Sequence, residues 1–153
     1  MPLPDVDHAW RVRVRWTDDR GADAYARAQS FHVGAQASLR DSDPAPSAIE
    51  YLLGALGGDL AHGFQREAAA RAAVIHGLEL SLGGRLDNIL VHLGVVGERG
   101  HAGLAAITGA MYVSSDADEA TIEAAWSAAL TRSPLFSTLS RAADVSIALR
   151  IVA

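Results

Sequence analysis

Residues 47–73 carry an apolar stripe at the spacing of a long α-helix. The large apolar side chains recur every three or four residues, which is the period of one helix face. They are Ile49, Leu52, Leu53, Leu56, Leu60 and Phe64. Ser47 and Glu50 form the capping box that starts such a helix. We therefore expect the chain to build its core around one long helix.

Four glycines lie inside the same helix. They are Gly54, Gly57, Gly58 and Gly63. Each glycine costs a helix about 1 kcal/mol relative to alanine. Because this cost is repeated, we expect either a kink or the very close approach of a second backbone, as where two helices cross.

Alternation of apolar and polar residues predicts strands on both sides of the helix. Trp10, Val12, Val14 and Trp16 alternate with three arginines, which is the period of a half-buried strand. Further strands are expected at 24–28, 30–33, 74–82, 107–113 and 145–152. Gly83 and Gly84 are expected to turn the chain into a loop at 85–103.

Two further helices are expected between the last two strands. Asp116 or Asp118 caps the first, at 119–131, and Ser133 with Pro134 starts the second, which ends near residue 142. The element order predicts one α+β domain over residues 1–153 with mainly antiparallel sheet. Its parts are a strand meander at 8–40, the central helix at 47–73 and a β-β-α-α-β segment at 74–153.

The composition excludes several classes of function. The chain has no cysteine, which excludes disulfides, thiolate nucleophiles and cysteine-ligated metals. Its formal charge of −5 argues against nucleic acid and anionic membranes as partners. A signal-peptide pattern and a bilayer-length apolar run are both lacking, so we expect a cytoplasmic protein. The six histidines are dispersed, and no metal or cofactor is expected.

Three segments carry family signatures. Residues 46–59 read PSAIEYLLGALGGD, residues 83–87 read GGRLD, and residues 132–139 read RSPLFSTL. They are similar to a central-helix signature P-x-x-x-E-x-L-L-x-A-L-x-x-C, a G-x-L-D strand exit, and a second signature C-P-V-x-x-T-L or S-P-V-F-x-x-L. From about Trp10 to Val152, the chain resembles the OsmC/Ohr family of osmotically inducible and organic-hydroperoxide-resistance proteins.

The resemblance implies an intertwined homodimer, in which the strands of both subunits wrap two long central helices. In this family a peroxidatic cysteine on the central helix attacks a hydroperoxide, a resolving cysteine opens the second signature, and both active sites lie at the dimer interface. The two cysteine positions correspond to Asp59 and Ser133. The family's assisting glutamate corresponds to Glu50, and its assisting arginine to Arg20 or Arg27.

Neither Asp59 nor Ser133 can perform the family's reaction. Peroxide reduction requires a thiolate that becomes a sulfenic acid, and a second thiol that resolves it. A carboxylate oxygen is a poor nucleophile toward an O–O bond. The sequence therefore excludes cysteine-based peroxidase chemistry and leaves open whether the chain is an enzyme.

Asp59 has two interpretations. It is either a functional carboxyl group, acting as acid or base or binding a ligand, or a structural residue paired with His62 and Arg66 on the same helix face. Glu50 is equally explained by the capping box. One ideal helix places Glu50 and Asp59 on opposite sides, about 13 Å apart along its axis. They cannot form a carboxylate pair within one subunit.

Ser133 and a basic stripe also have two interpretations each. Ser133 is either the N-cap of the following helix or the nucleophile of a Ser–His–Asp triad with Asp59, for which no nucleophile-elbow motif is present. Arg11, Arg13 and Arg15 alternate with apolar residues. We expect this stripe to be a solvated strand face paired with acidic residues.

Three functions follow. The first is the binding of a small apolar molecule in the pocket at the dimer interface. The second is an Asp59-dependent enzyme of non-redox chemistry, acid–base or hydrolytic. The third is a purely structural or stress-related dimer. The first is favoured because the central-helix signature is retained although both cysteines are absent. Ligand pockets are in general mainly apolar with a few polar groups.

Overall fold

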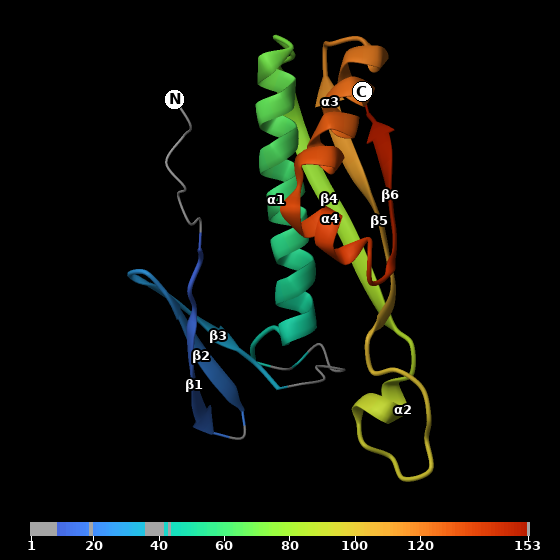
Figure 1. Cartoon of the computed structure of the whole chain (residues 1–153). Helices are drawn as coiled ribbons and strands as arrows, with labels where there is room; N and C mark the ends of the chain where they lie inside the picture. The colour runs from blue at the N-terminus through green and yellow to red at the C-terminus, as the bar shows by residue number, and fades with distance from the viewer. Residues whose placement is uncertain (1–8, 19, 36–41, 43, 153) are drawn as a thin grey trace, which may run out of the picture. The chain divides into compact units, whose positions relative to one another are not determined.

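The computed structural model describes residues 9–18, 20–35, 42 and 44–152. The chain groups into two compact units, Met1–Tyr51 and Leu52–Ala153. In Figure 1 the smaller unit runs from blue to cyan and the larger from green to red. Each unit contains its own three-stranded sheet.

The sheet of the smaller unit is an antiparallel meander, as the sequence predicts. Its strands, in order, are β1 (Arg13–Asp18), β2 (Gly21–Ala26) and β3 (Gln29–Val33). The alternation in the sequence begins at Trp10, but pairing begins only at Arg13. The strand expected at 24–28 is wrong at its end, because Ala26 already pairs with Gln29 and the turn lies between them.

The sheet of the larger unit contains both kinds of strand pair. Its order is β4 (Ile75–Leu86), β5 (Leu104–Ser115) and β6 (Asp144–Ile151). Strands β4 and β5 pair antiparallel, whereas β5 and β6 pair parallel. The parallel pair requires a crossover connection, which consists of α3 (Glu119–Arg132) and α4 (Pro134–Leu139). The α+β class with mainly antiparallel sheet is confirmed.

Strand β4 is longer than the sequence predicts. Gly83 and Gly84 do not turn the chain, because both pair with β5 and the strand continues to Leu86. A side chain at Gly84 would crowd the leucines around it, so glycine allows close packing at this position. The loop expected at 85–103 also contains a short helix, α2 (Ile89–His92).

The core of the larger unit lies between the sheet and the helices. Helix α1 (Ala48–Ala70) is the expected central helix, and in Figure 1 it runs along the same sheet as α3. The fully or almost fully buried side chains come from α1, β5 and α3, and the rings of Phe64 and Trp126 meet edge to face at 6.4 Å. They include Leu56, Leu60, Phe64, Ile107, Met111, Val113, Ile122 and Trp126.

The glycines of α1 divide into two pairs. A Cβ atom at Gly57 would lie 3.5 Å from a side chain of β4, and one at Gly63 would lie 3.8 Å from a side chain of α3. At Gly54 and Gly58, a Cβ atom would meet no described atom within 4 Å. Among the described residues, the contacts at Gly57 and Gly63 are ordinary contacts with side chains, so the very close approach of a second backbone expected from the sequence is not seen there, while Gly54 and Gly58 expose bare helix backbone.

No helix in the described part of the chain is long and apolar enough to cross a membrane.

Candidate functional site

Asp59 of α1 and Ser133, at the corner between α3 and α4, are in direct contact. The Ser133 hydroxyl donates a hydrogen bond to Asp59 Oδ2, with an Oγ–Oδ2 distance of 2.5 Å, within the range of short bonds to a carboxylate. Ser133 is 5% exposed, and Asp59 is half-buried. The structure therefore brings together the two positions that the family resemblance matches to the redox cysteines.

The local structure of the corner fixes the Ser133 hydroxyl. Ser133 Oγ accepts a hydrogen bond from the Phe136 backbone N–H at 2.9 Å. Ser133 is therefore the N-cap of α4, with Pro134 at the start of that helix, as the sequence predicts. The second role of the same hydroxyl, toward Asp59, joins residues 74 positions apart, and no local pattern reports it.

A second carboxylate of α1 is bound at the same corner. Glu67 is only 3% exposed. Its Oε2 atom accepts a hydrogen bond from Arg71 Nη1 at 2.9 Å, and its Oε1 atom accepts one from Arg132 Nη1 at 2.6 Å. The hydrogen bond from Arg71, together with Arg132, lowers the pKa of Glu67 below its ordinary value, although burial acts in the opposite direction.

Glu67 was missed by the sequence reasoning, although a signal was present. It continues the apolar stripe three residues after Phe64, so a helix places it on the buried face. A buried carboxylate needs a cationic partner. A search for arginines that can reach this face would have identified Glu67 as part of a buried ion-pair cluster.

Glu50 acts as the capping residue of α1. The Ser47 N–H donates to Glu50 Oε2 at 2.7 Å, and the Glu50 N–H donates to Ser47 Oγ at 3.3 Å. This is the reciprocal geometry of a capping box. The two candidate arginines lie in hairpin turns at opposite ends of β2: Arg20 in the turn before it, and Arg27 in the turn after it.

The structure does not support two of the sequence-based interpretations. Among the described residues, no ion pair joins Asp59 to His62 or Arg66. The Nε atom of Arg66 instead lies 3.9 Å from Glu67 Oε1. The expected structural partners of Asp59 were therefore wrong. A Ser–His–Asp triad needs a histidine between the hydroxyl and the carboxylate, but the hydroxyl of Ser133 donates directly to Asp59.

The arrangement offers a carboxylate and a hydroxyl, and its chemistry is that of polar binding. Within the described part of the chain, Asp59 Oδ1 has no hydrogen-bond partner. This atom is available to a hydroxyl or amino group of a ligand. No cluster of three or more histidine and carboxylate side chains that could hold a metal occurs among the described residues.

No protein-family model and no curated protein sequence matches the chain. Solved structures do match. An OsmC-like protein from Mycoplasma pneumoniae superposes with a TM-score of 0.81 at 16% identity, covering 96% of this chain and 99% of that chain.

Two hydroperoxide-resistance proteins also match in structure. The protein OsmC of Legionella pneumophila has a TM-score of 0.69 at 8% identity, covering 94% of this chain and 97% of that one. The protein OhrB of Bacillus subtilis has a TM-score of 0.62 at 13% identity, covering 93% and 98%. At identities this low, the likeness is one of fold alone.

Proposed function

We propose that this chain, which has the OsmC-like fold but no cysteine, is a homodimer that binds a small apolar molecule and does not reduce peroxides. The contact between Asp59 and Ser133 carries the proposal. Peroxide reduction needs two thiols that react in turn, and this chain has instead a carboxylate and a hydroxyl that bind each other. The OsmC-like fold is thus retained, but the two thiols that peroxide reduction requires are absent.

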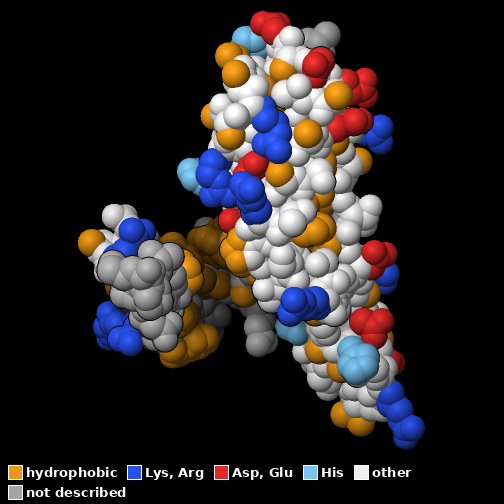
Figure 2. Space-filling view, turned by 45° about the horizontal axis from the view of Figure 1, so that its top comes forward, with side chains coloured by type: hydrophobic (Ala, Val, Ile, Leu, Met, Phe, Trp, Pro, Cys, Tyr) orange, Lys and Arg blue, Asp and Glu red, His pale blue; other side chains and the backbone are white. Residues whose placement is uncertain are grey.

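Two exposed surfaces support the homodimer. The first is the apolar row of the smaller unit, in which Val14 and Trp16 are 63% and 68% exposed. Figure 2 shows hydrophobic side chains (orange) on the surface of this unit. The second is the bare backbone at Gly54 and Gly58. Apolar surface of this kind on a single chain commonly marks an interface.

The polar atom available to a ligand is Asp59 Oδ1. Asp59 is half-buried, and the leucines on either side of it along α1, Leu56 and Leu60, are fully buried. A small number of polar groups in mainly apolar surroundings is typical of ligand pockets. The proposed ligand is therefore mainly apolar with one hydroxyl or amino group that reaches Asp59.

The test combines assembly with binding of a neutral apolar probe. Nile red is titrated into the protein, and cumyl alcohol is added to displace it, while sedimentation reports the oligomeric state. We expect a dimer and saturable, displaceable binding. Gly58→Leu should weaken both assembly and binding, because the leucine side chain would cover the exposed helix backbone that we assign to the dimer interface. Ala70→Leu, which adds the same side chain to another face of α1, should change neither. A dimer that binds no probe would favour a purely structural role.

An Asp59-dependent enzyme of non-redox chemistry is the second candidate. The observation that favours it is the free Oδ1 atom of a half-buried carboxylate, which could exchange a proton with a bound substrate. Asp59→Asn separates the two candidates, because it should abolish an acid–base activity while a hydroxylated ligand could still bind the amide. A cytoplasmic location stays a prediction of the sequence.

A further inference from the structure

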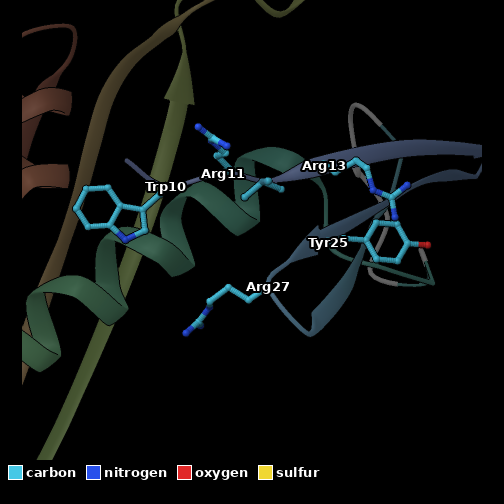
Figure 3. A pocket seen from close by; sticks show the side chains of 6 residues that line it. Trp10, Arg11, Arg13, Tyr25 and Arg27 are labelled. Atoms are coloured by element: carbon cyan, nitrogen blue, oxygen red, sulfur yellow. The ribbon is translucent and has the colours of Figure 1, made fainter. Parts of the chain in front are cut away.

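An open groove in the smaller unit has a volume of about 710 Å³. It is formed by the segment that leads into β1, together with β2 and the turn that follows it. The residues that line it are Trp10, Arg11, Val12, Arg13, Tyr25 and Arg27. Figure 3 shows the Arg13 side chain against the Tyr25 ring, with Trp10, Arg11 and Arg27 toward the other side of the view. The groove thus combines three cationic side chains with two aromatic rings.

Among the described residues, the arginines of this groove form no ion pair with a carboxylate. Farther along the hairpin, Arg15 stands opposite Asp23, and Asp23 Oδ1 lies 2.8 Å from His32 Nδ1. Across the residues that the structure describes, no carboxylate forms an ion pair with a guanidinium of the groove. The sequence-based expectation of a stripe paired with acidic residues therefore fails at this end of the hairpin.

The strand register places one of these cations on an aromatic ring. Arg13 stands opposite Tyr25, and the Arg13 guanidinium carbon lies 4.4 Å from the centre of that ring. Arg11 precedes β1 and Arg27 lies in the turn after β2, and both line the groove with exposed side chains. An anion in the groove would meet guanidinium groups that no described carboxylate neutralises.

The backbone of Arg27 gives a second, independent observation. Its φ is +56°, and it is the first of the two central residues of the β2–β3 turn. This position in such a turn favours glycine, because a side chain with φ above zero is strained. A strained residue at an exposed turn points to a use for its side chain.

We propose that this groove binds a small organic anion that carries a carboxylate or phosphate group on an aromatic ring. Arg11 and Arg27 bind the anionic group, since a guanidinium matches both groups with two parallel hydrogen bonds. Trp10, which is 88% exposed, stacks on the ring. The site is formed by other residues than the pocket of the proposed function, it is cationic rather than apolar, and it does not depend on that pocket.

Calorimetry on the full chain tests the proposal with four probes. These are phenyl phosphate, benzoate, inorganic phosphate and phenol. We expect phenyl phosphate and benzoate to bind at one site per chain, more tightly than inorganic phosphate, and phenol not to bind measurably. Affinity should fall as salt is added, because exposed charge pairs are screened. The relative affinities of phenyl phosphate and benzoate identify which anionic group the site prefers.

Variants assign the binding to the groove. The double variant Arg11→Gln/Arg27→Gln should lose at least tenfold in affinity for phenyl phosphate, while Arg15→Gln, on β1 outside the groove, should bind like the wild type. Trp10→Ala should reduce the preference for phenyl phosphate over inorganic phosphate. The proposal is overturned if neither aromatic anion binds at millimolar concentration, or if the double variant binds as well as Arg15→Gln does. Equal binding of phenyl phosphate and inorganic phosphate would overturn the role of Trp10.

Discussion

Ser133 Oγ lies 2.5 Å from Asp59 Oδ2, and the same oxygen accepts a hydrogen bond from the Phe136 N–H. One hydroxyl therefore serves two groups, the carboxylate of one helix and the first turn of another. Removal of the Ser133 hydroxyl would leave the Asp59 carboxylate and the Phe136 N–H without this hydrogen-bond partner. Ser133 is almost completely buried, so water replaces these bonds poorly.

Ser133→Ala should lower the free energy of unfolding by about 2 kcal/mol, since an N-cap and a hydrogen bond to a charged group are both lost. Urea unfolding measures the change. Ser127→Ala, at an exposed site on α3, is the matched control and should change stability little. In a cycle with Asp59→Asn, the two substitutions should be non-additive by at least about 0.5 kcal/mol. Full additivity would show that the contact is absent in solution.

The Glu67 cluster predicts a dependence of stability on pH. Arg71 and Arg132 lower the pKa of Glu67 in the folded chain below its ordinary value of 4.5. As the pH falls through this range, the unfolded chain takes up the proton first, so the stabilising contribution of Glu67 is lost. The contribution is complete above about pH 4.5 and disappears below the folded-state pKa.

Glu67→Gln should therefore show a shallower loss of unfolding free energy below about pH 4.5 than the wild type. Unfolding in urea over a series of pH values measures both slopes. Glu79→Gln, which changes an exposed glutamate on β4, should leave the wild-type slope unchanged. Identical acid profiles for Glu67→Gln and the wild type would contradict the ion-pair cluster.

The wild type should not consume cumene hydroperoxide in the presence of a dithiol, because the chain has no thiol. Restoring two thiols at the site tests its geometry. The double variant Asp59→Cys/Ser133→Cys should close an intrachain disulfide on mild oxidation, since these side chains are already in contact. Titration of free thiols measures closure, with each single variant as control. Two free thiols after oxidation would show that the two positions are not adjacent.

Trp16→Glu should weaken the proposed dimer at least tenfold, because it sets a charge in the exposed apolar row of the smaller unit. Trp16 is 68% exposed in the single chain, so the fold of the monomer should be little affected. Sedimentation equilibrium measures assembly. Arg15→Gln, on the opposite strand face, serves as the control. A wild type that remains monomeric at all concentrations would refute the dimer.

Arg27→Gly should raise the free energy of unfolding by about 1 kcal/mol, because glycine adopts φ above zero without strain and outweighs its own entropy cost. Ala28→Gly, at the other central residue of the same turn, should lower it, because Ala28 is not among the residues with positive φ. Thermal unfolding of the two variants measures the difference. If Arg27→Gly is destabilised as much as Ala28→Gly, the turn geometry is not that of the structure.

Local features of the fold were predictable because they depend on residues close in sequence. The capping box at Ser47 and the N-caps at Asp118 and Ser133 each involve a contact over three residues. The first and the last were predicted, and Asp118 was one of two candidates for its cap. The parallel pairing of β5 with β6 was not predicted. It depends on a crossover of two helices, and the apolar pattern of a strand is the same in either direction.

The candidate functional site was also predictable only where it depends on residues close in sequence. Asp59 and Ser133 were identified one at a time, but their contact depends on the packing of segments far apart in the sequence. Glu67 could have been found from the helix period. The arginine groove could not, because it requires the register of β1 against β2 and the conformation of the turn at Arg27, and neither is encoded in a short motif.

The corner between α3 and α4 is held at two places on a single helix. Arg132 and Ser133 are consecutive, yet they bind carboxylates eight residues apart on α1, at Glu67 and Asp59. Two separated anchors prevent the corner from sliding along α1 and from pivoting about it. The corner is therefore a rigid boundary beside Asp59, and any movement that opens a path to that carboxylate has to come from another segment.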